Sequence, residues 1–187
     1  MALHKWKIVK NENISPSRWY PLERHTVELP DGRQVEDYIV SHLDDIVMVV
    51  PILTSGEVVL VRQYKHGIRE IMIELPAGFI QAKKSILGSA VAELHEETGI
   101  QVAESQLIPL GKIAASPGKS LQVVHVYLAT QLEFNSTQHL DPNESIEVVT
   151  VSCEKLDEMI ESGQIWASVT ISALHLAKLK YPSLFAV

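Results

Sequence analysis

The chain has 187 residues, of which 46% are hydrophobic and 21% charged, as in an ordinary folded protein. This composition excludes intrinsic disorder and collagen-like repeats, and the length suits one domain with a small terminal extension. Sixteen Lys and Arg against 23 Asp and Glu give a formal charge of -7, which argues against nucleic acid or an anionic membrane as the main partner.

The cysteine content and the N-terminus bear on the cellular compartment. Cys153 is the single cysteine and cannot form an intramolecular disulfide, so nothing points to an oxidising compartment. No apolar run follows the basic N-terminal residues, and no stretch reaches the ~18 apolar residues of a membrane helix. We therefore expect a soluble, cytoplasmic protein. The eight His show no metal-ligand spacing and are interpreted as surface or core residues.

The first 40 or so residues are predicted to form an arm of short strands. Residues 31–32, Asp-Gly, are a strong hairpin-turn signal between the strand-like segments 27–30 and 35–40. The β-branched run Ile46–Leu53 is typical of a strand buried on both faces. Further strands are predicted at residues 57–64, 71–75, 107–115, 123–131 and 146–152.

The segment Ser85–Thr98 is the best helix candidate. Its apolar residues form one stripe at three- and four-residue spacing, namely Ile86, Leu87, Ala90, Val91 and Leu94. Ser85 is placed to cap the helix, and Gly99 is placed to end it. Helices are also predicted at 154–162 and 168–180. The order of elements predicts an α+β fold, a mixed sheet covered by helices on its faces.

Three carboxylates lie near the C-terminal end of this helix: Glu93, Glu96 and Glu97. The helix dipole is negative there, and like charges three or four residues apart repel. No basic residue lies one turn before them, and Lys83 and Lys84 stand at the other end of the helix. Local electrostatics therefore costs stability, which a hard cation such as Mg²⁺ would reverse. A solvated charged face is the alternative interpretation.

The segment Gly78–Ile100 resembles the Nudix box, G-x5-E-x7-R-E-U-x-E-E-x-G-U, in which U is aliphatic. Gly78 takes the first glycine, and residues 93–100, ELHEETGI, match the second half in register. Four neighbouring segments are similar to the branch of the family that hydrolyses ADP-ribose and other nucleoside diphosphate sugars: Val61–Gly67, Glu74–Gly78, Ser116–Gly118 and Pro142–Val148. The likeness extends from about Trp19 to Leu179.

The resemblance implies a Nudix-type α/β/α sandwich around a mixed β-sheet. Residues 1–42 would be an N-terminal β arm, and residues 43–187 would be the hydrolase domain. A hairpin arm cannot bury its own apolar face alone, and in the resembling branch such an arm often packs on a second subunit. We therefore expect a homodimer.

The box departs from the family pattern at two positions, where Lys84 replaces the usual Glu and Ala92 the usual Arg. In family members these two residues typically form an ion pair that helps to orient the first metal-binding Glu. Their joint loss leaves no unpaired charge, but it removes support from Glu93. A catalytically weak or inactive Nudix-fold module that binds a nucleotide or regulates a partner is therefore the alternative to an enzyme.

The resemblance also implies the roles of the site residues. Glu93 and Glu97 would be catalytic metal ligands, joined by Glu96 and the backbone carbonyl of Ala77, with Mg²⁺ as the metal and Mn²⁺ as the alternative. The general base would be Glu144, for which Asp141 and Glu147 are substitutes.

Arg62 and Glu74 would bind the substrate. A guanidinium group suits phosphate oxygens because it donates two parallel hydrogen bonds. The implied reaction is metal-dependent hydrolysis of a pyrophosphate bond, with ADP-ribose giving AMP and ribose 5-phosphate.

Overall fold

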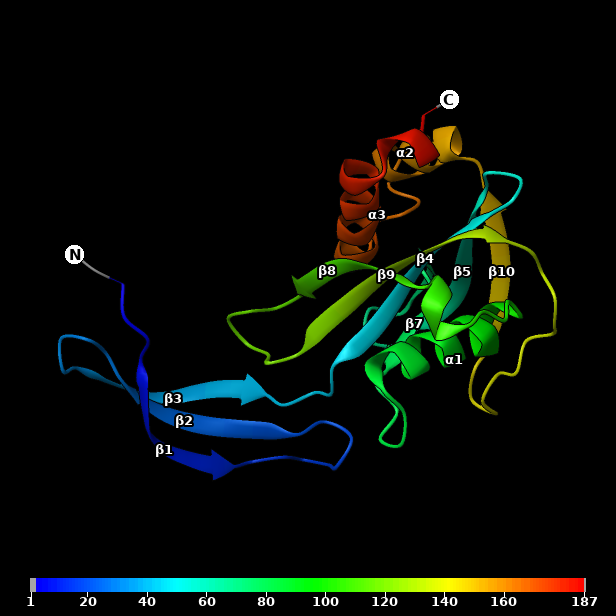
Figure 1. Ribbon diagram of the computed structural model, residues 1–187. Helices are drawn as coiled ribbons and strands as arrows, with labels where there is room; N and C mark the ends of the chain where they lie inside the picture. Colours follow the sequence, from blue (N-terminus) through cyan, green and yellow to red (C-terminus); the bar gives the residue numbers. More distant parts are fainter. Residues whose placement is uncertain (1–2, 187) are drawn as a thin grey trace. The chain divides into compact units, whose positions relative to one another are not determined.

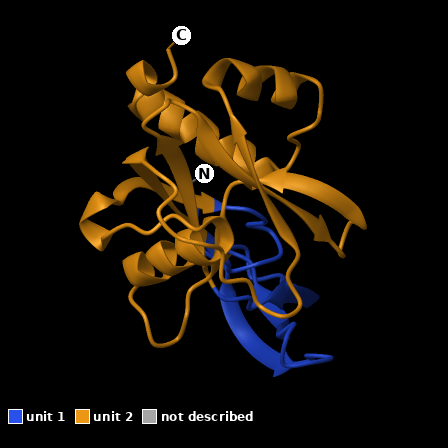
Figure 2. Ribbon diagram, turned by 90° about the vertical axis from the view of Figure 1, so that its right-hand side faces the viewer, with its two compact units in different colours: residues 1–44, 114–123 blue, residues 45–113, 124–187 orange. Residues whose placement is uncertain are grey.

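A computed structural model describes residues 3–186 of the chain. The chain divides into two compact units, which Figure 2 shows in different colours: residues 1–44 with 114–123, and residues 45–113 with 124–187. Within the described residues, no helix is both long enough and apolar enough to cross a membrane.

The first unit contains a three-stranded antiparallel sheet in the order β1-β2-β3, made of β1 (Lys7–Asn13), β2 (Leu22–Glu28) and β3 (Gln34–Ser41). The predicted turn between β2 and β3 is confirmed. Gly32 adopts a positive φ of 83° and donates a hydrogen bond to the Leu29 carbonyl, at 2.9 Å. Glycine takes this backbone conformation without the steric cost that a Cβ imposes.

The second unit contains a seven-stranded mixed sheet. Five strands follow the order β10-β5-β4-β9-β8, while β6 pairs with β5 and β7 pairs with β4. β4 runs antiparallel to β5 and parallel to β9. The strands are β4 (Ile46–Leu53), β5 (Val58–Lys65), β6 (Glu70–Glu74), β7 (Ala77–Phe79), β8 (Ile108–Ala114), β9 (Val123–Leu132) and β10 (Ile146–Val151).

Helices pack on both faces of this sheet (Figure 1), namely α1 (Ile86–Thr98), α2 (Cys153–Glu161) and α3 (Ser168–Lys180). Successive side chains of β4 alternate between two cores because a strand has a period of two. Met48 and Val50 pack in the core with residues of α2 and α3, whereas Val47 and Val49 pack with residues of α1. The predicted α/β/α sandwich is confirmed. The described part of the chain also contains two short 3-10 helices, Glu104–Gln106 and Pro182–Leu184.

Helix α1 has the predicted ends. The Ser85 hydroxyl accepts a hydrogen bond from the Gly88 N–H at 2.8 Å, and Gly99 ends the helix in the left-handed conformation with φ of 76°. Strand β7 was not predicted as a separate element. It pairs with β4 through Met48 and Ala77, and this pairing fixes the backbone beside which the acidic end of α1 lies.

Candidate active site

The carboxylates of α1 face a cavity of about 690 Å³ in the second unit. Strand β7, the acidic part of α1 and the loop between β9 and β10 supply its walls. Its charged lining residues are Lys65, Glu93, Glu96, Glu97, Asp141 and Glu144, together with His139. Four predicted site residues, Glu93, Glu96, Glu97 and Glu144, therefore line one cavity together with Asp141, the alternative general base. Ala77 also lines this cavity.

Glu97 is the most deeply buried of these carboxylates, with 4% of its surface exposed. Its Oε2 accepts a hydrogen bond from the Ala77 N–H at 2.9 Å. Burial raises the pKa of Glu97 to about 8, and the nearby charges of Glu93 and Glu144 add to this rise, while the Ala77 hydrogen bond and Lys65 oppose it. The hydrogen bond from Ala77 thus offsets only part of the cost of burying the negative charge of Glu97. A bound cation would offset the remainder.

Glu93 lies directly against the backbone of Gly78. A Cβ added at Gly78 would lie 2.1 Å from Oε2 of Glu93, so only glycine admits this approach. Burial is the largest cause of the raised pKa of Glu93, which the charges of Glu96 and Glu144 raise further. The first glycine of the box therefore has a steric function, because it makes room for a carboxylate.

Gln81 bridges two of the carboxylates and was not identified from the sequence. Its Nε2 donates to Oε1 of Glu93 at 3.2 Å and to Oε2 of Glu96 at 3.3 Å. The amide holds the two acids with their oxygens turned toward one side chain. A glutamine in a loop carries no distinctive sequence signal, so only the folded geometry identifies this contact.

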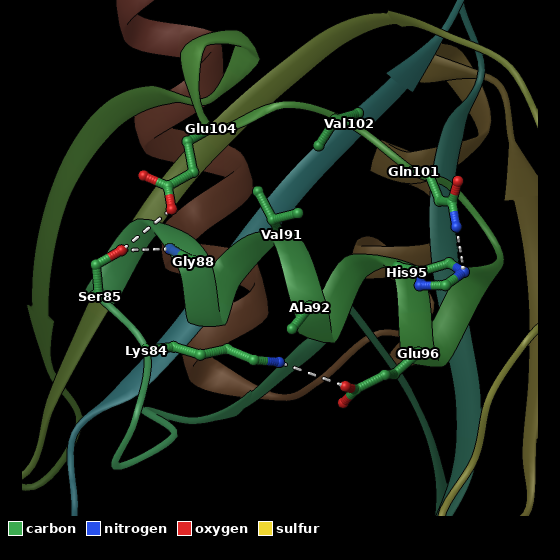
Figure 3. A pocket seen from close by; sticks show the side chains of 10 residues that line it. All are labelled: Lys84, Ser85, Gly88, Val91, Ala92, His95, Glu96, Gln101, Val102 and Glu104. Atoms are coloured by element: carbon green, nitrogen blue, oxygen red, sulfur yellow. Dashed lines mark hydrogen bonds and ion pairs between the residues drawn. The ribbon is translucent and has the colours of Figure 1, made fainter.

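Lys84 corrects one expectation from the sequence. It was placed at the far end of α1, away from the acids, yet its Nζ lies 3.8 Å from Oε1 of Glu96. Figure 3 shows the Lys84 side chain extending past Ala92 toward Glu96, along a second cavity of about 580 Å³. The short side chain of Ala92 leaves this path open. The two departures from the box, Lys84 and Ala92, therefore line the same cavity.

Lys84→Met is expected to tighten Mg²⁺ binding by about two- to fivefold, because removal of a partly exposed positive charge beside Glu96 makes the site more negative. Isothermal titration with Mg²⁺ at low salt would measure this change. Lys83→Met is the matched control, because Lys83 is the neighbouring exposed lysine and, in the part of the chain that the structure describes, lines neither cavity. Equal affinities in both variants would contradict the expected effect.

The loop between β9 and β10 is attached to the C-terminal end of α1. Gln138 Nε2 donates to the carbonyl of Glu97 at 2.7 Å and to that of Ile146 at 3.2 Å, and the His139 N–H donates to the carbonyl of Glu96 at 2.9 Å. The His139 ring also contacts the His95 ring, with centroids 5.0 Å apart. These bonds satisfy carbonyls that a helix end leaves unpaired.

Beyond this attachment the same loop makes a turn that carries two acids. The Glu144 N–H donates to the Asp141 carbonyl at 2.9 Å, and Oε2 of Glu144 accepts from the Asp141 N–H at 3.0 Å. Both residues line the cavity. Glu147 instead lies on β10, outside the cavity lining, and pairs with Arg62 at 3.4 Å.

The two predicted substrate-binding residues lie on the neighbouring hairpin. Arg62 on β5 makes its ion pair with Glu147 across the strand pair β5–β10. Glu74 on β6 presents a buried oxygen 3.1 Å from Nζ of Lys65. Among the described residues, neither Arg62 nor Glu74 lines the cavity, whereas Lys65 does.

The donors of this site fit a hard divalent cation. Carboxylate oxygens of Glu93, Glu96 and Glu97 come from one rigid helix, and the strand β7 backbone passes beside them. Mg²⁺ and Mn²⁺ prefer such oxygen ligands. Burial raises the pKa of both Glu93 and Glu97, so ionisation of these two neighbouring carboxylates is unfavourable unless a positive charge lies close to them.

Comparison with known proteins adds independent information. Residues 42–172 match the family model described as NUDIX domain, and residues 6–41 match the model described as nucleoside diphosphate sugar hydrolase N-terminal domain. The chain is 29% identical over 175 residues to the ADP-ribose pyrophosphatase of Bacillus subtilis (strain 168), covering 93% of each chain.

Two further similarities span nearly the whole chain. The methanol dehydrogenase activator of Bacillus methanolicus is 28% identical over 179 residues, covering 95% of each chain. A solved structure described as an ADP compounds hydrolase matches with a TM-score of 0.85 and 23% identity, covering 98% of this chain and 97% of the other. At this identity the structural match establishes the fold.

Proposed function

Because the chain belongs to the Nudix family, we propose that it is a metal-dependent hydrolase of the pyrophosphate bond in nucleoside diphosphate sugars. ADP-ribose is the proposed substrate, cleaved to AMP and ribose 5-phosphate. The observation that carries this proposal is the buried Glu97, held by Ala77 and facing a cavity with Glu93. The ADP-ribose pyrophosphatase of Bacillus subtilis, similar over 93% of both chains, supports the substrate.

The carboxylates of Glu93, Glu96 and Glu97, with the carbonyl of Ala77, would hold Mg²⁺, or Mn²⁺ in its place. Such a cation screens the charge of the phosphate oxygens and lowers the pKa of a water molecule. Gln81 keeps Glu93 and Glu96 oriented through its amide. The protein thus supplies charge and position, which are the main requirements of phosphoryl chemistry.

Glu144 is the proposed general base, which accepts the proton of the attacking water. Its position in the cavity, and its turn with Asp141, support this role over that of Glu147, whose carboxylate pairs with Arg62. Asp141 is the remaining alternative, because it lines the same cavity.

Glu144→Gln is expected to lower kcat by about 100-fold, the usual scale for loss of a general base. Mg²⁺ affinity should fall by no more than about fivefold, because Glu144 contributes a nearby negative charge but is not a proposed ligand. Steady-state kinetics with ADP-ribose and a Mg²⁺ titration would measure both quantities. Glu147→Gln is the control and should retain activity. A full loss of metal binding in Glu144→Gln would instead make this residue a ligand.

A turnover screen tests the function itself. The protein would be incubated with ADP-ribose, ADP-glucose, GDP-mannose, UDP-glucose and NADH, each with Mg²⁺ or Mn²⁺, and products would be separated by chromatography. Cleavage that needs the metal and is lost in Glu97→Gln would support the enzyme and identify its substrate.

Arg62 and Glu74 are proposed substrate contacts because they belong to the same hairpin as Lys65, a cavity residue.

The second candidate is a Nudix-fold module that binds a nucleotide or regulates a partner with little turnover. Lys84 and Ala92 favour it, since an ammonium group close to Glu96 competes with a metal ion for the same carboxylate. Absence of cleavage for every substrate, with Mg²⁺ binding retained, would select this candidate over the hydrolase.

We also propose that residues 1–42 form an arm that contacts a second subunit, while residues 43–187 form the hydrolase domain. Every residue of β1 is exposed, and so are the apolar side chains of Trp6, Ile8 and Val9. Exposed edge strands of this kind are normally covered. Sedimentation of the full chain at micromolar concentration is expected to show a dimer, and a monomer would contradict the proposal.

A further inference from the structure

Three metal-ligating side chains converge in the first unit: Glu23, His25 and His42. Glu23 and His25 lie two residues apart on β2 and therefore point to the same face of the sheet. Val40 pairs with Glu23 across β2–β3, and His42 follows two residues later, so it belongs to that face as well. A hydrogen bond from the His42 N–H to the Pro21 carbonyl, at 3.0 Å, fixes the backbone there.

The two imidazoles approach the same carboxylate oxygen. Oε2 of Glu23 lies 2.9 Å from Nε2 of His25 and 3.1 Å from Nε2 of His42, and the three ligand atoms lie within 4.8 Å of one another. Three ligands of a tetrahedral zinc ion, each ~2.0–2.1 Å from the metal, lie about 3.3 Å apart. The spacing of the oxygen to each nitrogen is therefore close to that of a zinc site.

Hydrogen bonding alone leaves this cluster unsatisfied. Within residues 3–186, Nε2 of His42 is a buried atom without a hydrogen-bond partner, although the carboxylate is close. Oε2 of Glu23 also accepts from Nδ2 of Asn11 at 3.5 Å, so one oxygen faces three nitrogen groups. Buried polar atoms usually have partners, and an imidazole nitrogen that lacks one beside a carboxylate and a second imidazole is suited to bind a cation.

Burial gives the cluster a defined shape while leaving a route from solvent. His25 is only 6% exposed, whereas the side chains of Glu23 and His42 are 28% and 35% exposed. An ion could therefore enter from the side of Glu23 and His42, and a water molecule could complete its coordination. Two imidazoles and one carboxylate favour Zn²⁺ over Mg²⁺, which prefers oxygen ligands alone.

We propose that Nε2 of His25, Nε2 of His42 and the carboxylate of Glu23 bind one Zn²⁺ ion, which ties the end of β3 to β2. This site differs from the carboxylates of α1 in the unit that carries it and in the type of donor atom. It belongs to the first unit, and its nitrogen donors distinguish it from the all-oxygen site proposed for Mg²⁺.

The test is a metal titration of the full chain after removal of bound metal. Zn²⁺ is expected to bind with one equivalent in the presence of excess Mg²⁺, and Co²⁺ in its place should give the intense visible absorption of a tetrahedral site. Zn²⁺ at about 100 times its Kd should raise the Tm by roughly 5 °C. His42→Asn should weaken Zn²⁺ binding by on the order of 100-fold, because one of three ligands is lost.

Control variants separate this site from its alternatives. His175→Asn removes an exposed histidine of α3 and should leave the Co²⁺ spectrum intact. Glu97→Gln should also leave this spectrum intact, which would show that the Zn²⁺ site is independent of the metal site proposed for the hydrolase. Glu23→Gln is a second ligand variant. Its Zn²⁺ affinity is compared with that of the wild type, provided that the Tm of the metal-free variant equals that of the metal-free wild type. Binding that survives both His42→Asn and Glu23→Gln, an octahedral Co²⁺ spectrum, or loss of the signal in Glu97→Gln would each overturn the proposal.

Discussion

Glu97→Gln is expected to lower kcat/KM for ADP-ribose by about 10³- to 10⁴-fold, because a proposed metal ligand and its negative charge are lost together. The same change should make the metal-free protein more stable at alkaline pH. Gln is nearly isosteric with Glu, and its carbonyl oxygen can still accept the hydrogen bond from the Ala77 N–H. Activity and stability should therefore move in opposite directions.

The pH dependence of stability follows from the pKa of Glu97. Burial raises this pKa from its ordinary value of 4.5 to about 8 in the folded protein. Between these two values the folded state holds a proton that the unfolded state has released. The stabilisation linked to this proton is complete below pH 4.5 and is lost as the pH rises through about 8. At and above that pH, Glu97→Gln is expected to raise the free energy of unfolding by about 4 to 5 kcal/mol.

Urea unfolding in EDTA, at pH values from about 5 to about 8, would measure this effect. The wild type should lose stability over this range, and Glu97→Gln should lose distinctly less. Glu133→Gln removes the same charge from an exposed position and should behave like the wild type. A Glu97→Gln protein that hydrolyses ADP-ribose normally, or that shows the wild-type pH dependence, would contradict the role given to this carboxylate.

The sequence was sufficient for the elements whose signals are local. The period of apolar residues, the Ser85 cap and the terminal Gly99 predict α1, and the structure has this helix with both ends as expected. The β-branched run 46–53 predicts a strand buried on both faces, which β4 is. The three-residue strand β7 was not predicted because so short a segment carries no recognisable period.

The parts of the site that the sequence did not predict depend on chain reversal and strand register. Gln81 reaches two helix residues only because the preceding loop folds back onto α1. His25 and His42 meet because of the pairing of β2 with β3, which includes a register shift just after His25. Spacing along the chain gives no indication of such a contact, so the eight histidines looked unremarkable in the sequence. The register of the β2–β3 pair brings residues that are distant in the sequence into one cluster.

The close approach of Glu93 to Gly78 leads to a test with an unusually selective outcome. In Gly78→Ala the three atoms nearest to the new Cβ would all belong to the carboxylate of Glu93, with Oε2 at 2.1 Å, Cδ at 2.3 Å and Oε1 at 2.7 Å. Gly78 is not among the described glycines with positive φ, so alanine fits its backbone conformation. The flexible end of Glu93 must therefore move, while the strand can stay in place.

Gly78→Ala is expected to lower kcat on the order of 10³-fold, because displacement of Glu93 breaks both the proposed ligand set and its contact with Gln81. The Tm of the metal-free protein should change by no more than about 3 °C, since a side-chain rotation costs little stability. Kinetics and thermal unfolding, measured on one preparation, would check both.

Gly67→Ala is the matched control and should retain activity, because a Cβ at Gly67 meets no atom of the described residues within 4 Å. Normal turnover in Gly78→Ala would show that the position of Glu93 is not required for hydrolysis. Global unfolding would show instead that the backbone of β7, rather than the carboxylate, bears the clash. Selective loss of turnover in a stable protein would support the inference that this glycine serves the site by leaving room for Glu93.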